Sequence, residues 1–287
     1  MSIFPPIYER KRAEKMKLKE AALILSGAGI EDSLREARAI FSHFDKTPLS
    51  RLVASEAESE NILVAEAISR RAQREPLQYI LGEVGFYKES YKVSPSCLIP
   101  RSDTEILVEY AVNHIKPGAR FVDICTGSGC VAISTLKNTA DTSCVAIDLS
   151  PEALEIAKEN AKRHKVEGRV EFLLADALLS ETAASLGSFD AVLSNPPYVK
   201  DSEYEKLAPE IFHEPKMAFV GGEDGADFYR TLTPIYKKLL SKGGFIAFEI
   251  GYDSSPVLAK IAEREKMSLE ILKDLSNNPR VAVLRNL

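Results

Sequence analysis

The sequence predicts an α/β protein with a mostly parallel sheet, preceded by a small helical domain. Residues 8–74 place apolar side chains at helical spacing, with no strand signal between them. Residues 76–100 are rich in β-prone side chains broken by glycines, which favours a β-hairpin. After this hairpin, strand and helix patterns alternate, which indicates a parallel sheet covered on both faces. We therefore expect a helical domain at 1–75, a β-hairpin linker at 76–100 and an α/β domain at 101–287.

The helical part should contain three helices that end at glycine or proline. Gly27 and Gly29 end the first helix, and the last one ends before Pro76. These helices are expected around 18–25, near 31–44 and at 59–74. The β-prone residues of the linker are Tyr79, Ile80, Val84, Phe86, Tyr87, Tyr91 and Val93.

In the α/β part, seven predicted strands alternate with helices. Ser102-Asp103-Thr104-Glu105 has the S-x-x-E pattern of a capping box and should open a helix that ends near residue 114. Ser150 and Pro151 should cap and start another helix. Further helices are expected at 130–137, 151–164, 227–240 and 256–266. The strands are expected at 120–125, 144–148, 170–174, 191–194, 245–250, 269–273 and 281–285.

Length and charge limit the possible functions. The 287 residues suffice for a full hydrophobic core without disulfides or metals, and the net charge is −5. Residues 1–75 hold 13 basic and 12 acidic side chains, whereas residues 76–287 hold 24 and 30. This distribution argues against a protein that grips nucleic acid over a broad basic face. Six basic and three acidic residues fall in the first twenty, and we interpret that stretch as a solvated helix face.

The cysteines and the hydropathy indicate where the protein works. No cysteine pair has C-x-x-C spacing, so we expect reduced, mostly buried thiols and no metal site. No apolar run approaches the roughly 20 residues of a membrane span. The charged residues 9–12 stand where a signal peptide would need an apolar core. We therefore expect a soluble, cytoplasmic protein. The cysteines are Cys97, Cys125, Cys130 and Cys144.

A glycine-bearing turn, Asp123-Ile124-Cys125-Thr126-Gly127-Ser128-Gly129, joins a buried strand to a helix. Glycines there let the backbone approach a ligand, and Asp123 is costly inside an apolar strand unless its carboxylate is satisfied. Asp148 ends the next strand, at the spacing from which a carboxylate accepts both hydrogen bonds of a ribose diol. This order predicts a nucleoside cofactor. Because Ala132 is a permitted last residue of a dinucleotide-binding turn, the turn alone leaves both a dinucleotide and S-adenosylmethionine open.

Asn195-Pro196-Pro197-Tyr198 directly follows a predicted strand. Consecutive prolines cannot continue a central strand, and they remove N–H donors while leaving carbonyl acceptors. The acceptors and the aromatic plane of Tyr198 suit a planar substrate that bears an –NH2 group. Hydrogen bonds to both hydrogens localise the nitrogen lone pair and orient it, and proximity to a methyl donor supplies much of the rate.

Residues 123–129, Asp148, Asp176 and residues 195–198 resemble the class I, Rossmann-like, S-adenosylmethionine-dependent methyltransferases that modify planar amino groups. In that class an acidic residue at the place of Asp176 usually meets the adenine amino group. Further segments narrow the resemblance to the HemK/PrmC-type release factor glutamine methyltransferases. These segments are 73–82, Phe86, 98–105, 213–215, 221–225, 248–251 and 278–281.

The resemblance implies N5-methylation of the glutamine in the Gly-Gly-Gln loop of peptide chain release factors. S-adenosyl-L-methionine would be the methyl donor and S-adenosyl-L-homocysteine the product, and a monomer would suffice without metal, membrane or nucleic acid. On this template, Asn195 and the Pro196 carbonyl grip the glutamine amide, while Pro197 and Tyr198 shape its slot. The implied cofactor site comprises Asp123, Ile124, Cys125, Thr126, Gly127, Gly129, Asp148, Leu149, Asp176, Ala177 and Asn195, closed from the linker side by Phe86, Pro100, Arg101 and Thr104.

Four residues need separate comment. Cys125 stands where the family usually has glycine, and we expect the turn to survive because cysteine is small. Ala177 replaces a larger, often aromatic residue, which bears on the adenine contact. Arg101 could close over the cofactor, or it could cap a helix or bind a carboxylate. For Glu249 we favour a structural role as a satisfied carboxylate at a strand end.

Other functions remain to be weighed against this interpretation. An adenine or guanine amino-group methyltransferase acting on DNA or RNA would use the same pocket. It predicts a basic face and a target-recognition domain, which the acidic α/β part and the nearly neutral helical part do not favour. A non-enzymatic cofactor-binding or ribosome-associated module would not need the intact residues 195–198, and a dinucleotide oxidoreductase would leave them unexplained.

Overall fold

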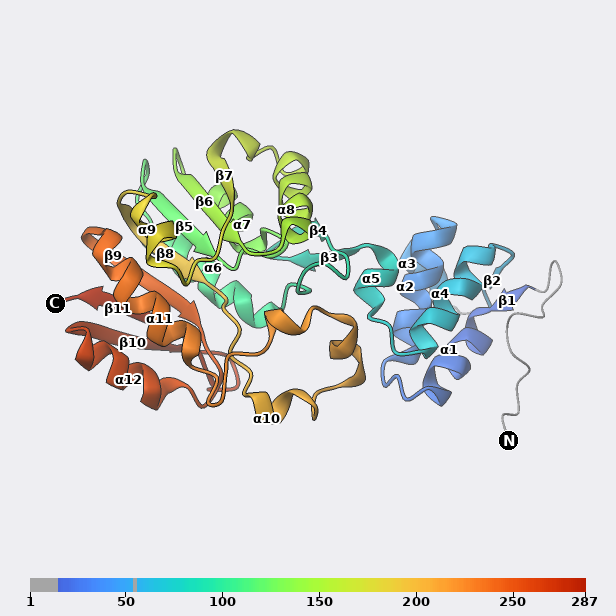
Figure 1. The fold of residues 1–287 in the computed structure, drawn as a ribbon. Coiled ribbons are helices and arrows are strands. Elements are labelled where there is room, and N and C mark those ends of the chain that lie inside the picture. The colour runs from blue at the N-terminus through green and yellow to red at the C-terminus, as the bar shows by residue number, and fades with distance from the viewer. Residues whose placement is uncertain (1–14, 54–55) are drawn as a thin grey trace. The chain divides into compact units, whose positions relative to one another are not determined.

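The computed structural model describes residues 15–53 and 56–287 (Figure 1). The chain divides into two compact units. The first runs to Gly82 and includes Pro209–His213, and the second comprises Glu83–Ala208 and Glu214–Leu287. Gly82 falls inside the segment 76–100 that we expect to join two domains, and the predicted boundaries at 75 and 100 stay predictions. The predicted helical start at Tyr8 and most of the basic stretch lie outside the described residues.

The first unit is helical, as predicted. Leu18, Ile40 and Ile68 are fully buried in its core, because the apolar residues of each helix share one face. A short antiparallel strand pair, β1 with β2, was not predicted; it involves two residues on each side and leaves no strand pattern in the sequence. The elements are β1 (Met16–Lys17), α1 (Leu18–Gly27), α2 (Ser33–Asp45), α3 (Leu49–Leu52), β2 (Glu58–Ser59), α4 (Ile62–Ala72), α5 (Leu77–Leu81) and the 3₁₀ helix η4 (Pro209–His213).

The linker begins with a helix rather than a strand, which corrects our expectation for Tyr79 and Ile80. Both belong to α5, which starts after Pro76 and ends at Gly82 with a left-handed φ of 75°. Ile80 is buried in the core of the helical unit, so tertiary packing outweighs its β propensity. The predicted hairpin follows, with β3 (Glu83–Phe86) paired antiparallel to β4 (Glu89–Lys92).

Two arginines of the helical unit hold the Pro209–His213 segment. Arg71 is 6% exposed and donates from Nε to Glu36 at 2.6 Å and from Nη1 to Glu210 at 3.0 Å. Arg74 donates to the other oxygen of Glu210 at 2.9 Å. Both arginines lower the pKa of Glu210 against the opposing effect of its burial, so this carboxylate stays charged.

The second unit has the predicted alternation of strands and helices. After the hairpin, its strands are β5 (Arg120–Ile124), β6 (Ser143–Asp148), β7 (Val170–Leu174), β8 (Phe189–Ser194), β9 (Leu240–Glu249), β10 (Met267–Lys273) and β11 (Pro279–Asn286). Its helices are η2 (Ser102–Thr104), α6 (Glu105–His114), α7 (Cys130–Asn138), α8 (Pro151–Arg163), η3 (Glu167–Arg169), α9 (Ser180–Ala184), α10 (Asp201–Tyr204), η5 (Lys216–Ala218), α11 (Asp227–Tyr236), η6 (Lys237–Leu239) and α12 (Ser255–Arg264).

Within the described chain, the seven strands β5 to β11 form one sheet in the order β10-β11-β9-β8-β5-β6-β7. The pairs among β5 to β9 are parallel, and β11 is antiparallel to both β9 and β10. The mostly parallel sheet is therefore confirmed. The chain passes from β5 outward to β6 and β7, and then returns to place β8 on the other side of β5. This reversal is a topological switch point, where open parallel sheets bind their ligands.

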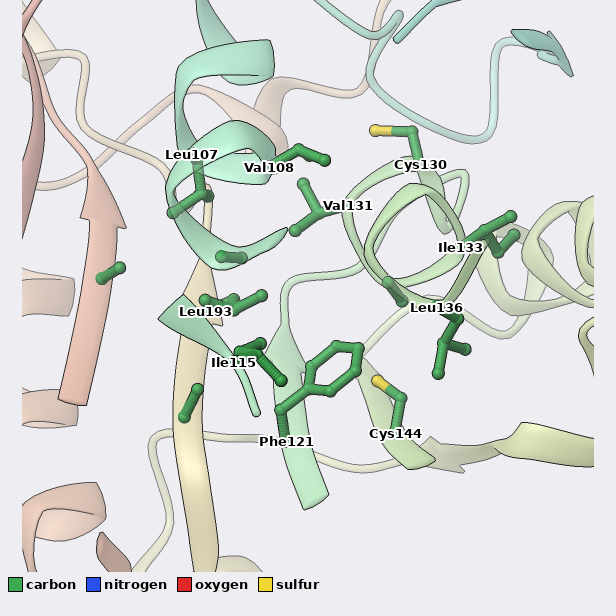
Figure 2. Close-up of a cluster of buried hydrophobic side chains, with 14 of the residues drawn as sticks. Leu107, Val108, Ile115, Phe121, Cys130, Val131, Ile133, Leu136, Cys144 and Leu193 are labelled. Atoms are coloured by element: carbon green, nitrogen blue, oxygen red, sulfur yellow. The ribbon is translucent and has the colours of Figure 1, made fainter. Parts of the chain in front are cut away.

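Helices cover both faces of the sheet (Figure 1). Residues of α6, α7 and α8 share a core with one set of strand residues, and those of α9, α11 and α12 share a core with the alternate set. Figure 2 shows the first core, in which Leu107 and Val108 of α6 and Val131 of α7 pack near Phe121 and Leu193 of the sheet. Among the described residues, no helix combines the length and the apolar character needed to cross a membrane.

One predicted helix cap is confirmed and one is wrong. The Ser150 side chain accepts a hydrogen bond from Ala153 N at 3.1 Å, with Pro151 in the first turn of α8. The predicted capping box at 102–105 does not form. Ser102–Thr104 make the 3₁₀ turn η2, α6 starts at Glu105, and neither helix has a side-chain cap bond at its N-terminus. Glu105 instead accepts the backbone N–H of Tyr87 in the hairpin turn at 2.9 Å.

Gly129 sets the contact between α7 and α8. Its φ is +80°, and an added Cβ would lie 2.9 Å from Ile133 Cδ1 and 3.1 Å from Ala157 Cβ. We expect Gly129→Ala to lower the free energy of unfolding by about 2–4 kcal/mol through backbone strain and overpacking. Gly168→Ala is the control, since a Cβ there has no atom within 4 Å. Equal thermal midpoints for the two variants would contradict the close packing at Gly129.

Candidate active site

A cavity of about 380 Å³ lies where β5, β6, β7 and β8 end, at the switch point of the sheet. It falls in the size range of small-molecule sites. Eight predicted site residues line it: Cys125, Gly127, Asp148, Leu149, Asp176, Ala177, Asn195 and Pro197. Three carboxylates (Asp148, Glu152 and Asp176) line this cavity, and none of its lining residues is Lys, Arg or His.

Asp123 supports the glycine-bearing turn from beneath. It is 1% exposed and does not line the cavity. Its Oδ2 accepts the Thr126 hydroxyl at 2.6 Å and the N–H of Ala132, in the first turn of α7, at 3.2 Å. Burial raises its pKa to about 7, while these two hydrogen bonds oppose the shift. The carboxylate that the sequence marked as costly therefore holds the turn and the helix start together.

Cys125 keeps the turn in the conformation expected for glycine. Its φ is 59°, a left-handed value that strains residues with a Cβ. Its side chain lines the cavity, and burial raises the pKa of the thiol. None of the four cysteines forms a disulfide; three of them are buried and Cys125 is half-buried, as predicted. The turn survives the departure from glycine, and a thiol forms part of the cavity wall.

Asp148 and Asp176 face the cavity from the next two strand ends. Asp148 Oδ2 accepts Gly127 N–H at 2.8 Å and its Oδ1 accepts Ser150 N–H at 3.0 Å, so it links the glycine turn to α8. Burial raises its pKa against these backbone bonds. Each carboxylate oxygen still has a lone pair for a ligand hydroxyl. Asp176 accepts Leu178 N–H at 2.9 Å, and Ala177 beside it leaves that wall without an aromatic ring.

Asn195 follows β8 and is oriented by Thr104. Its Nδ2 donates to Thr104 Oγ1 at 3.2 Å, which leaves Oδ1 without a donor from the described residues. Pro196 does not line the cavity, and no described group donates to its carbonyl oxygen. Two acceptors of adjacent residues are therefore available where β8 ends.

A glycine-rich return segment clamps the proline loop. Val199 N donates to Phe219 O at 2.7 Å, and Gly221 N donates to Val199 O at 2.8 Å. A Cβ at Gly221 would lie 2.6 Å from Pro197 O, and one at Gly225 would lie 2.3 Å from Tyr198 O. Glycine is required at both positions because the two backbones touch.

The Tyr198 side chain is partly buried and does not line the cavity. Its hydroxyl donates to Glu249 Oε1 at 3.0 Å. Glu249 is 1% exposed at the end of β9. The predicted aromatic plane is thus used to anchor the loop in this structure.

Several predicted cofactor residues support the cavity without lining it. Phe86 is packed against Tyr91 in the core, with ring centroids 5.9 Å apart. Arg101 forms an ion pair with the buried Glu214. Of the three roles considered for Arg101, the structure therefore shows carboxylate binding, and the carboxylate belongs to this chain. The predicted residues outside the lining are Phe86, Pro100, Arg101, Thr104, Asp123, Ile124, Thr126, Gly129, Pro196 and Tyr198.

Two walls of the cavity are formed by residues that the sequence did not predict as site residues. One is residues 95–98, just after the hairpin, and the other is Pro215, Met217 and Ala218. Glu214 joins them, because its Oε2 accepts Ile99 N–H at 2.9 Å while its Oε1 binds Arg101. The sequence held a signal for this pairing, since both segments are among those that carry the family resemblance. The other missed lining residues are Ile147, Ser150, Glu152, Ala153, Ala175, Leu178 and Phe228.

The described residues contain no group of three or more His, Cys, Asp or Glu side chains that could hold a metal ion.

The raised pKa of Asp123 predicts a pH-dependent stability. The unfolded carboxyl loses its proton near its ordinary pKa of 3.8, whereas the folded one keeps it up to about pH 7. Between these values the folded state binds more protons, so this group makes stability fall as the pH rises. We expect the stability of Asp123→Asn relative to the wild type to rise from pH 4 to 7 and then level off. Parallel stability curves in denaturant across this range would contradict the shift.

The clamp predicts a local effect of Gly221→Ala. Because the added Cβ would meet the backbone at Pro197 and Tyr198, the bonds of Val199 should weaken by about 1–3 kcal/mol. Amide exchange of the peptides covering 197–201 and 219–225 should then accelerate about tenfold or more. Gly27→Ala, where a Cβ meets no atom within 4 Å, should leave these peptides unchanged. Unchanged exchange in the Gly221 variant would show that the loop does not depend on the clamp.

Comparison with known proteins places the chain in a family. The PrmC N-terminal domain family matches residues 17–82, and the Methyltransferase small domain family matches residues 102–223. A release factor glutamine methyltransferase from Clostridium acetobutylicum is 35% identical over 280 residues, which cover 93% of this chain and 98% of that protein. One from Thermodesulfovibrio yellowstonii is 37% identical, over 88% and 92% of the two chains.

A solved structure shares the fold over about two thirds of the chain. The ribosomal protein L11 methylase from Lactobacillus delbrueckii subsp. bulgaricus has a TM-score of 0.50 and 20% identity, over 68% of this chain and 83% of that one. This likeness bears on the fold alone. The two curated relatives match nearly end to end, through the helical unit, the glycine turn and the proline loop, and by that similarity the chain belongs to the release factor glutamine methyltransferase family.

Proposed function

We propose that this enzyme transfers a methyl group from S-adenosyl-L-methionine to the side-chain amide nitrogen of the glutamine in the Gly-Gly-Gln loop of peptide chain release factors. The observation that carries the proposal is the pair of acceptors at the end of β8, Asn195 Oδ1 and the Pro196 carbonyl. They suit an amide –NH2, which has two hydrogens to donate. The names of the curated relatives support the same substrate.

The donor set of the cavity fits S-adenosyl-L-methionine better than a dinucleotide. A pyrophosphate needs backbone N–H donors or basic side chains, whereas this cavity is lined by three carboxylates and by no basic side chain. Carboxylates suit the ammonium and sulfonium charges of S-adenosyl-L-methionine. Asp148 would accept the ribose hydroxyls and Asp176 the adenine amino group, with Ala177 and Leu149 against the ring.

The chain's own part in the reaction is to bind and orient the amide. When bound, the cofactor would supply an electrophilic methyl group and leave as S-adenosyl-L-homocysteine. Asn195 and the Pro196 carbonyl would accept the two amide hydrogens, which localises the nitrogen lone pair and aims it at the methyl carbon. Transfer would form the nitrogen–carbon bond as the carbon–sulfur bond breaks, and the protonated amide would lose its proton to water. No general base is required for this step.

Partner and compartment follow from this proposal. The substrate would be a translation factor, so we propose that the enzyme works in the cytoplasm as a monomer. The helical unit would serve in substrate recognition. Neither role requires nucleic acid or a membrane.

A labelling experiment tests the substrate. The protein is incubated with methyl-labelled S-adenosyl-L-methionine and either a release factor, its Gly-Gly-Gln variant with Gln→Ala, or DNA. We expect label in the intact release factor only. Label in DNA would favour the nucleic-acid alternative, and label retained by the Gln→Ala variant would place the methyl group on another residue.

Asn195→Ala separates substrate orientation from cofactor binding. Loss of one acceptor in the reacting geometry should lower kcat by about 10²–10³-fold, as for other preorganised hydrogen-bonding groups. The dissociation constant of S-adenosyl-L-methionine, measured by calorimetry, should change little. Asp148→Asn is the reverse control and should weaken cofactor binding first. Equal losses of transfer and binding in Asn195→Ala would make Asn195 a cofactor or folding residue.

A further inference from the structure

Glu249 lies beside the proline loop but belongs to a different strand. In the parallel pair β8–β9, Ser194 is opposite Phe248, so Asn195, just after β8, is next to Glu249, the last residue of β9. Glu249 is 1% exposed and does not line the cavity. It therefore meets neither cofactor nor substrate directly, and its effect must pass through the residues it contacts.

One oxygen of this carboxyl is paired and the other is not. Oε1 accepts the Tyr198 hydroxyl at 3.0 Å. Oε2 is buried and has no hydrogen-bond partner among the described residues. A buried acceptor of this kind is costly, so a nearby donor is expected to turn toward it.

The Thr104 hydroxyl is able to donate a hydrogen bond. It is 2% exposed, and its Oγ1 accepts Nδ2 of Asn195 at 3.2 Å. A hydroxyl accepts through its lone pairs and donates its hydrogen once, and that hydrogen rotates to suit its surroundings. The Thr104 hydroxyl also lowers the pKa of the Glu249 carboxyl.

The donor and acceptor roles in these hydrogen bonds depend on one another. If Thr104 donates to Glu249, it meets Asn195 as an acceptor, and the Asn195 amide must present Nδ2 to it. Oδ1 of Asn195 then faces the other way, as an acceptor for the substrate. A second path runs through Tyr198, whose hydroxyl donates to the same carboxyl.

We propose that Glu249 is a positioning residue for methyl transfer, whose carboxylate acts through Thr104 and Tyr198 to hold the Asn195 amide oxygen toward the substrate. The sequence favoured a purely structural role for Glu249, and the inference differs from that expectation. The inference rests on the proposed function.

The role of the carboxylate makes the reaction depend on pH. Burial raises the pKa of Glu249 to about 7, and Asp103 in η2 adds to the shift. The Thr104 and Tyr198 hydroxyls and Arg280 of β11 oppose it, while Tyr229 of α11 reaches only the backbone oxygen of Glu249, at 3.0 Å. As the pH falls through about 7, the carboxyl gains a proton and one acceptor becomes a donor. Transfer should weaken in that direction.

The test compares Glu249→Gln with the wild type on a release factor substrate. We expect kcat to fall about tenfold or more, in keeping with the loss of hydrogen bonds to a charged group. The dissociation constant of S-adenosyl-L-methionine should stay within about twofold of the wild-type value, a difference that corresponds to little binding energy. The wild-type kcat should decline below pH 7, whereas the variant should be low and flat in this range. Asp123 titrates in both proteins, so the comparison isolates Glu249.

Three further variants test the path and the fold. Thr104→Val should reproduce the loss of kcat, and Thr104→Ser, which keeps the hydroxyl, should restore most of it. Tyr229→Phe is the matched control, since it removes a hydrogen bond to the Glu249 backbone and not to the carboxyl; it should keep the wild-type kcat and pH profile.

Three results would overturn the inference. The first is a wild-type kcat and pH profile in Glu249→Gln. The second is a parallel loss of kcat, cofactor binding and thermal stability in that variant, which would mark a structural role. The third is a wild-type enzyme that labels no release factor, which would remove the proposed function and this inference with it. A wild type that labels the release factor while its Glu249→Gln variant is unaffected contradicts the inference alone.

Discussion

Two adjacent prolines determine how the candidate active site is built. Pro196 and Pro197 have no backbone N–H, so the ladder of β8 ends before them. The chain beyond must obtain its hydrogen bonds elsewhere, and Val199 obtains them from the return segment that contains Gly221. That segment has to touch the loop backbone to backbone, which only residues without a Cβ allow. The acceptors of the loop and the glycines twenty-odd residues later are therefore one structural feature.

Buried carboxylates do much of the positioning around this loop. Asp123 holds the glycine turn to α7, Asp148 holds the same turn to α8, and Glu249 holds Tyr198. Each accepts hydrogen bonds from backbone or hydroxyl groups, and burial raises the pKa of each. The cavity is lined by Asp148, Glu152 and Asp176 and by no basic side chain, so it is suited to a cationic ligand. Asp148 thus contributes both to the rigidity of the site and to the electrostatic character of the cavity.

The sequence predicts what local pattern and motif spacing determine. The seven strands, the Ser150 cap and the convergence of Cys125, Asp148 and Asn195 all follow from apolar periodicity and from the topology of parallel sheets. Tyr79 was predicted in a strand because of its β propensity. It lies in a helix instead, because that helix is stabilised by packing against segments far away in sequence. The capping box failed for a similar reason, since Glu105 is used by the hairpin turn. The missed cavity walls also depend on a contact between distant segments, which no local pattern encodes.

The chain segment that leads to the wall of Pro215, Met217 and Ala218 is held at several points. Glu210, which precedes this wall in the sequence, is held by Arg71 and Arg74 within the helical unit. Next to the wall, Glu214 binds Ile99 N–H and Arg101 within the α/β unit. The position of this wall within the α/β unit therefore depends on the Glu214 carboxylate, which joins segments that lie 113 to 115 residues apart in the sequence.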